Sequence, residues 1–184
     1  MRKVAGVLLA ISLVVPAAAI AANSAGAAAT ALPKCKALSG VQTFTPGLPK
    51  IGDPKLVKPV TKTTLTITGC TGGGITGGTS SSSVKATTAT NCNTVVKNSG
   101  KPGAPSAGVI KWSNGQTSTT SNVLTVTSKP GASPIIAKLV SKYTAGLGKG
   151  KTSTAIVQAV PNAGFCTKVP FTKSTFKSTK ITSN

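Results

Sequence analysis

The chain has 184 residues, the size of a single domain, and carries 21 lysine and arginine residues, one acidic residue and no histidine, for a formal net charge of +20 at pH 7. General acid–base catalysis usually relies on histidine or paired carboxylates, and calcium or magnesium sites need charged oxygen ligands. This composition excludes glycosidase carboxylate pairs, Ser-His-Asp triads and hard-cation sites. We therefore expect a protein that is not an enzyme and holds no metal or cofactor.

The first 31 residues have the features of a secretory signal peptide followed by an alanine-rich leader. Arg2 and Lys3 precede an apolar run over residues 4–15, and small residues beyond Pro16 offer cleavage sites between residues 21 and 32. The alternative is a membrane anchor, because the apolar run through Ala22 is long enough to span a bilayer. The absence of a basic stop-transfer flank favours cleavage, so residues 32–184 are the expected secreted domain, extracellular or associated with the cell wall.

Beyond residue 32, β-branched residues separated by glycine and proline predict about eight strands. Pro46 and Pro49 should stop the first strand, and Pro59 should restrict the second to a sheet edge or a strand start. Asn114 and Gly115 suit a type I′ turn, which would join two strands within residues 108–127. The remaining strands are expected at 38–44, 56–68, 80–90, 133–146, 152–160 and 168–182.

Residues 133–146 allow two interpretations. Ser133 could cap a helix that begins with Pro134, since apolar residues follow at helical spacing. The β-branched content and the strand-rich surroundings favour a strand. The fold class we predict is all-β: a single immunoglobulin-like or meander β-sandwich of about eight antiparallel strands, monomeric, with two disulfides.

Four cysteines in an exported chain predict two disulfides. They are widely spaced, unlike the close pairs of zinc ribbons. If the strands alternate in direction, Cys35 and Cys70 lie at one end of the domain and Cys92 and Cys166 at the other. The favoured pairing of three is therefore Cys35–Cys70 with Cys92–Cys166.

Two short motifs resemble catalytic signatures. Residues 146–153, GLGKGKTS, end like a phosphate-binding P-loop, but Ala145 stands where that motif needs its first glycine and a β-branched run follows instead of a helix. Two S-x-x-K tetrads, at 82–85 and 174–177, resemble penicillin-binding-type Ser-Lys chemistry, but both lie in sequence that predicts strands. We interpret the first as a lysine-bearing hairpin connection and the tetrads as chance matches.

Trp112 is the only tryptophan, and it could stack on a sugar or pack in the core. Its place just before a tight turn, with Ile110 on the same face, favours core packing.

After Lys3 every basic residue is a lysine, and Asp53 is the only carboxylate side chain. Such a surface can serve solubility and guard sheet edges, or it can attract polyanions. The lack of arginine argues against sequence-specific nucleic-acid recognition. The candidate contacts with an anionic cell-envelope polymer or an anionic lipid surface are Lys138, Lys142, Lys149, Lys151, Lys173, Lys177 and Lys180.

Several segments resemble a group of small secreted, four-cysteine, β-rich proteins from actinobacteria: CKALSG at 35–40, GC at 69–70, NC at 91–92, IKWSNGQTS at 110–118 and FC at 165–166. The resemblance implies a cell-envelope or extracellular setting and carries over no catalytic residue. We expect a secreted protein that binds anionic polymer or membrane surface through lysines. The alternatives are a membrane-active antimicrobial or toxin-like protein and an enzyme with unusual Ser-Lys chemistry.

Overall fold

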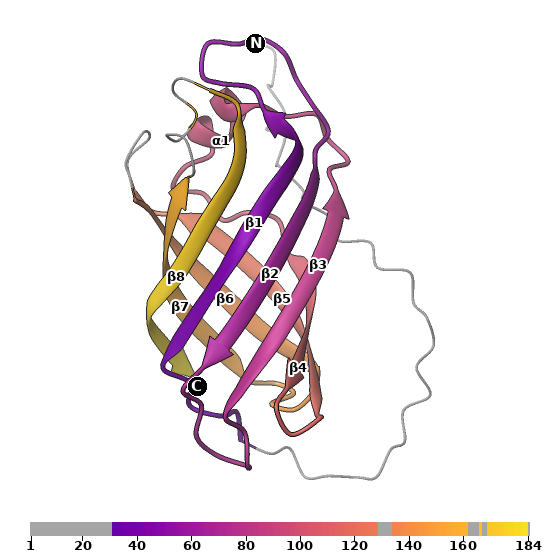
Figure 1. The fold of residues 1–184 in the computed structure, drawn as a ribbon, viewed down its shortest axis with the longest axis vertical. Helices are drawn as coiled ribbons and strands as arrows, with labels where there is room; N and C mark the ends of the chain where they lie inside the picture. Colours follow the sequence, from indigo (N-terminus) through magenta and orange to yellow (C-terminus); the bar gives the residue numbers. More distant parts are fainter. Residues whose placement is uncertain (1–30, 129–133, 162–165, 167–168, 184) are drawn as a thin grey trace, which may run out of the picture.

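Eight antiparallel strands follow one another in chain order around a closed barrel, and the last strand pairs with the first (Figure 1). The computed structural model describes residues 31–128, 134–161, 166 and 169–183. The predicted signal peptide and nearly all of the leader lie outside the described residues. The strands are β1 (Ala37–Leu48), β2 (Val60–Thr68), β3 (Gly77–Lys85), β4 (Ser106–Trp112), β5 (Thr117–Val126), β6 (Ile135–Gly146), β7 (Thr152–Pro161) and β8 (Phe171–Ser183).

The predicted β-sandwich is wrong, because β8 pairs antiparallel with β1 and closes the sheet on itself. Gly40 of β1 lies opposite Phe176 of β8, and Ser39 lies opposite Lys177. Inward and outward residues alternate along a strand in the same way in a sandwich and in a barrel. The closing pair joins the two strands that are furthest apart in the sequence, so no local pattern distinguishes the two folds.

Residues 135–146 form a strand, as favoured, and the helical alternative is wrong. The strand pairs with β5 on one side and β7 on the other, so both edges of its backbone are satisfied within the sheet. The first strand runs past Pro46, contrary to expectation. The pairing of β1 with β8 shifts register between Thr43 and Leu48, and a proline is tolerated at such an irregularity.

The turn between β4 and β5 is not the predicted type I′. Gly115 has a φ of 84°, but Asn114 is not in the positive-φ region that type I′ also requires. Gly115 N–H donates to Trp112 O, and Asn114 Oδ1 accepts from Gln116 N–H. The turn is therefore a three-residue loop with glycine in its last, left-handed position, and the Asn114 side chain bridges it.

A short helix, α1 (Cys92–Lys97), was not predicted. The predicted strand over 80–90 ends at Lys85, and Asn91 caps the helix by accepting a hydrogen bond from Thr94 N–H at 3.1 Å. Asn91 Nδ2 donates to the carbonyls of Asp53 and Lys55, which holds the helix against the β1–β2 connection.

Each end of the barrel is closed by an apolar cluster and a disulfide. At the α1 end, Cys92–Cys166 packs with Leu48, Ile135 and Phe171. At the opposite end, Cys35–Cys70 joins a second cluster, whose buried members are Leu38, Ile67, Cys70, Ile75, Ile110, Trp112, Tyr143 and Leu147. These are the cysteine pairs expected from strands of alternating direction.

Between the two clusters the barrel wall presents many small polar side chains inward. Gln42 Nε2 donates to Thr63 Oγ1 at 3.5 Å, and Thr120 Oγ1 donates to Gly108 O at 3.4 Å. Within the described residues, no buried side-chain nitrogen or oxygen lacks a hydrogen-bond partner. The barrel is therefore held by apolar packing at its ends and by a satisfied polar layer in its middle.

Candidate functional site

The seven lysines proposed as polyanion contacts are all exposed. Lys138 and Lys142 lie on β6, Lys149 and Lys151 on the β6–β7 turn, and Lys173, Lys177 and Lys180 on β8. The register brings two of them close, because Lys138 and Lys180 both lie opposite Ile156 of the intervening strand β7. Two strand spacings separate them, about 10 Å, which is close to the Debye length at physiological ionic strength.

The other lysines in the described residues do not join these seven on one face. Lys62, Lys85 and Lys111 lie on β2, β3 and β4, on the part of the wall that Figure 1 shows in front and to one side. Further exposed lysines lie before β1, between β1 and β2 and around α1: Lys34, Lys36, Lys50, Lys55, Lys58, Lys97 and Lys101. The positive charge therefore surrounds the barrel and both of its ends.

This charge has almost nothing within the chain to neutralise it. Asp53 is the only acidic residue, and its Oδ1 accepts a hydrogen bond from Lys55 N–H at 2.9 Å in the loop between β1 and β2. Asp53 lies in this loop, whereas the lysines of the barrel wall lie on the strands themselves. Their field is available to an external anion.

The P-loop-like segment forms the β6–β7 turn, as interpreted, and four of its N–H groups already donate to carbonyls of the chain. Leu147 N–H donates to Thr117 O, Lys149 N–H to Gly146 O, Gly150 N–H to Tyr143 O and Lys151 N–H to Gly148 O. A phosphate cradle needs several free N–H groups that converge on one point. This turn offers lysine side chains to an anion but no such cradle.

The S-x-x-K tetrads place their serine and lysine on opposite faces of a strand. Ser174 is buried at 3% exposure, whereas Lys177 on the same strand is exposed. Ser82 is half-buried and Lys85 is exposed. Residues three apart in a strand point to opposite sides, so neither lysine can take a proton from its serine.

Trp112 is 4% exposed and belongs to the core, as predicted. Its Nε1 donates to Ser118 Oγ at 2.7 Å, and Ser118 Oγ donates to Leu147 O at 2.8 Å. The ring is therefore not available to stack on a sugar.

A seam between β3 and β4, where the barrel wall is paired over a short distance only, was not predicted. Gly78 pairs with Trp112 and Thr79 with Lys111, and no further pair joins these two strands. β2 and β3, by contrast, pair along the whole of β3. At this seam the closed sheet is held by these two residue pairs and by the hydrogen bond from Ser113 N–H to Gly77 O.

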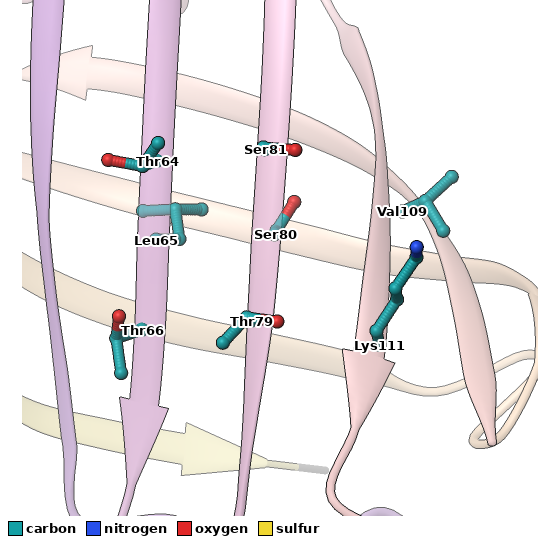
Figure 2. Close-up of a pocket in the computed structure, with 8 residues that line it drawn as sticks. All are labelled: Thr64, Leu65, Thr66, Thr79, Ser80, Ser81, Val109 and Lys111. Atoms are coloured by element: carbon teal, nitrogen blue, oxygen red, sulfur yellow. The ribbon is translucent and has the colours of Figure 1, made fainter. Parts of the chain in front are cut away.

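A groove of about 380 Å³ lies along the seam (Figure 2). It is lined by Thr64, Leu65, Thr66, Thr79, Ser80, Ser81, Val109 and Lys111. Figure 2 shows Val109 and Lys111 on one face of β4, with the lysine side chain extending along the strand toward Val109. A second hollow of about 290 Å³ continues along β2 and β3 and shares Thr64 and Ser81 with the first. In the sequence, the groove is indicated only by two runs of small residues, at 80–83 and 106–108. Such runs are too common to predict a groove.

The described residues contain no group of three or more His, Cys, Asp or Glu side chains placed to hold a metal ion. In the same part of the chain, no helix has the length and apolar character needed to cross a membrane. The two disulfides indicate an oxidising compartment. Comparisons with protein-family models, with curated proteins and with solved structures found no match.

Proposed function

We propose that this chain is an exported, monomeric, non-enzymatic protein of the cell envelope or extracellular space that binds an anionic polymer through its lysines. The single observation that carries the proposal is the exposure of every described lysine around a rigid barrel whose chain has one acidic residue. The resemblance to small secreted actinobacterial proteins agrees with an anionic cell-wall polymer as the partner.

The proposed mechanism is long-range attraction followed by contact with several lysines at once. A linear polyanion can follow the barrel circumference, so it needs no single basic face. Lys138 and Lys180, on either side of Ile156, are close enough to act on the same stretch of polymer. The opposite orientation of serine and lysine in each S-x-x-K tetrad supports binding rather than Ser-Lys catalysis.

The test measures binding of a fluorescent polyphosphate to the full chain as a function of salt concentration, with neutral dextran as the control polymer. We expect affinity for polyphosphate that falls steeply with salt, and no binding to dextran. Replacing the pair Lys138→Gln and Lys180→Gln should make the salt dependence shallower. Thr175→Gln, an exposed neutral position on β8, is the matched control.

Polyphosphate binding that does not change with salt, or equal retention of neutral dextran, would contradict the proposal. Vesicles of anionic lipid loaded with a dye provide a second arm. Dye release would favour the membrane-active function over polymer binding. Binding to the vesicle surface without dye release would support the charge mechanism.

A further inference from the structure

We propose that the seam between β3 and β4 is a docking site for an extended, acidic segment of a partner protein, which adds to the free edge of β3 as a strand. The proposal goes beyond polymer binding, because the partner would be held by backbone hydrogen bonds. The charge of the lysines would determine only that the partner is acidic.

The first step is the orientation of the backbone groups along the seam. Ser113 N–H donates to Gly77 O across the seam. Since consecutive residues of a strand direct their N–H and C=O groups to opposite sides, Ser81 and Ser83 direct theirs toward β4. Trp112 N–H donates to Gln116 O on the other side, so Ala107 and Val109 direct their backbone groups toward β3.

The second step is that these groups have no strand partner. Pairing between β3 and β4 ends at Thr79 and Lys111, and no other described segment pairs with β3 beyond that point on this side. Unpaired N–H and C=O groups along a strand edge form a template for another strand. The free stretch of β3, from Ser80 to Lys85, has the length of an ordinary strand.

The third step is access. The outward side chains of β3 beside the seam are the small Ser81 and Ser83, and those of β4 across it are Ala107 and the exposed, larger Val109. The first hollow reaches from β2 across β3 to β4 at this part of the wall, and the second lies over β2 and β3 only. Natural sheet edges are commonly blocked by proline, a bulge or a charged residue on the edge itself. Ser81 and Ser83 supply no such block, and the charged residues at this edge are Lys85, at the end of β3, and Lys111 across the seam.

The fourth step identifies the occupant by its charge. Lys111 lies opposite Thr79 at the paired end of the seam, Lys62 lies opposite Ser83, and Lys85 ends β3. No carboxylate lines either hollow. A strand placed beside β3 would direct alternate side chains outward among these lysines, where acidic residues are favoured. Its other side chains would face the small polar residues of the barrel interior, where threonine fits.

The experiment uses the full chain and a fluorescently labelled, terminally blocked peptide of alternating glutamate and threonine. A second peptide has the same sequence with N-methyl groups on alternate residues, which removes backbone donors and keeps the charge. We expect saturable binding of the first peptide, and affinity at least about tenfold weaker for the second, because about two backbone hydrogen bonds are lost. Hydrogen exchange should show protection of the Ser81 and Ser83 amides on binding of the first peptide.

Lys111→Gln should weaken binding of the first peptide about twofold to fivefold. Lys97→Gln, at an exposed lysine of α1 that lines neither hollow, should leave it unchanged. Equal affinity for the two peptides, protection confined to other amides, or protection of Ser81 and Ser83 by polyphosphate alone would each overturn the proposal. Salt-dependent binding of polyphosphate elsewhere on the barrel would still support polymer binding if the peptide experiment contradicted strand docking. The two proposals can therefore be tested independently.

Discussion

Trp112 Nε1 donates a 2.7 Å hydrogen bond to the hydroxyl of Ser118, which in turn donates a 2.8 Å hydrogen bond to the carbonyl of Leu147. Ser118 is completely buried, and the three residues belong to β4, β5 and the β6–β7 turn. This chain of hydrogen bonds fixes the lysine-bearing turn to the apolar cluster that closes the barrel.

Replacing Ser118 with alanine should lower the free energy of unfolding by about 1–3 kcal/mol, because the buried Trp112 N–H is left without an acceptor. Trp112 is the only tryptophan, so its fluorescence during denaturant unfolding measures the change directly. Ser121→Ala, at an outward position of the same strand opposite Ala107, is the control and should stay within about 0.5 kcal/mol of the parent. Equal effects of the two variants would show that the hydrogen-bond chain contributes no stability.

The two disulfides should stabilise the fold by similar amounts. They close loops of 35 and 74 residues. The chain-entropy relation gives about 4 kcal/mol for each, with the longer loop larger by less than about 1 kcal/mol. We expect paired Cys→Ala replacement at 92 and 166 to lower the unfolding free energy slightly more than replacement at 35 and 70. A clearly larger loss from the Cys35–Cys70 pair would contradict this order.

Stability should fall at alkaline pH through Tyr143. Burial raises the pKa of Tyr143 above its usual 10.0, and a hydrogen bond with the Ser153 side chain offsets part of this rise. Below the unfolded-state pKa the phenol is protonated in both states. Above it, only the unfolded chain releases the proton, so the free energy of unfolding falls as pH rises toward the folded-state pKa.

This pH effect has a clean reporter, because Tyr143 is the only tyrosine. Its ultraviolet phenolate absorbance should titrate above pH 10 in the folded protein and near pH 10 in denaturant. Tyr143→Phe keeps the lysines and removes the phenol, so its stability should fall less steeply as the pH rises above about 10. Parallel curves for parent and variant would contradict the assignment.

Gly40 is required by the close approach of two neighbours, the β2 backbone at Thr64 and the ring of Phe176. A Cβ at this position would lie 2.5 Å from Phe176 Cζ and would also collide with Thr64 O. Gly40→Ala should therefore cost about 1–3 kcal/mol of stability, whereas Ser39→Ala, the exposed outward neighbour, should be nearly neutral. Combining Gly40→Ala with Phe176→Leu should recover part of the loss. No recovery would indicate that the backbone contact with Thr64 dominates.

Much of the strand layout was predictable because its causes are local. β-branched runs and the prolines and glycines between them predicted eight strands, and the number of strands between the cysteines put Cys35 with Cys70 and Cys92 with Cys166. The expected turn type at Asn114 was wrong because the Asn114 side chain bonds Gln116 and stabilises a different loop. The helix at Cys92–Lys97 was missed because it is short, and only Asn91 marks its start.

By itself, the sequence determined the all-β class and a positive charge that one aspartate cannot neutralise, and it favoured the burial of Trp112 and the observed pairing of the cysteines. These properties follow from composition, from the alternation of side chains and from the direction of successive strands. Only the tertiary structure decided that β8 closes on β1, that the lysines surround the barrel, and that pairing between β3 and β4 ends at Thr79 and Lys111. Closure of the barrel and the position of the seam depend on the twist and register of all eight strands together. A short stretch of sequence cannot predict this combined geometry.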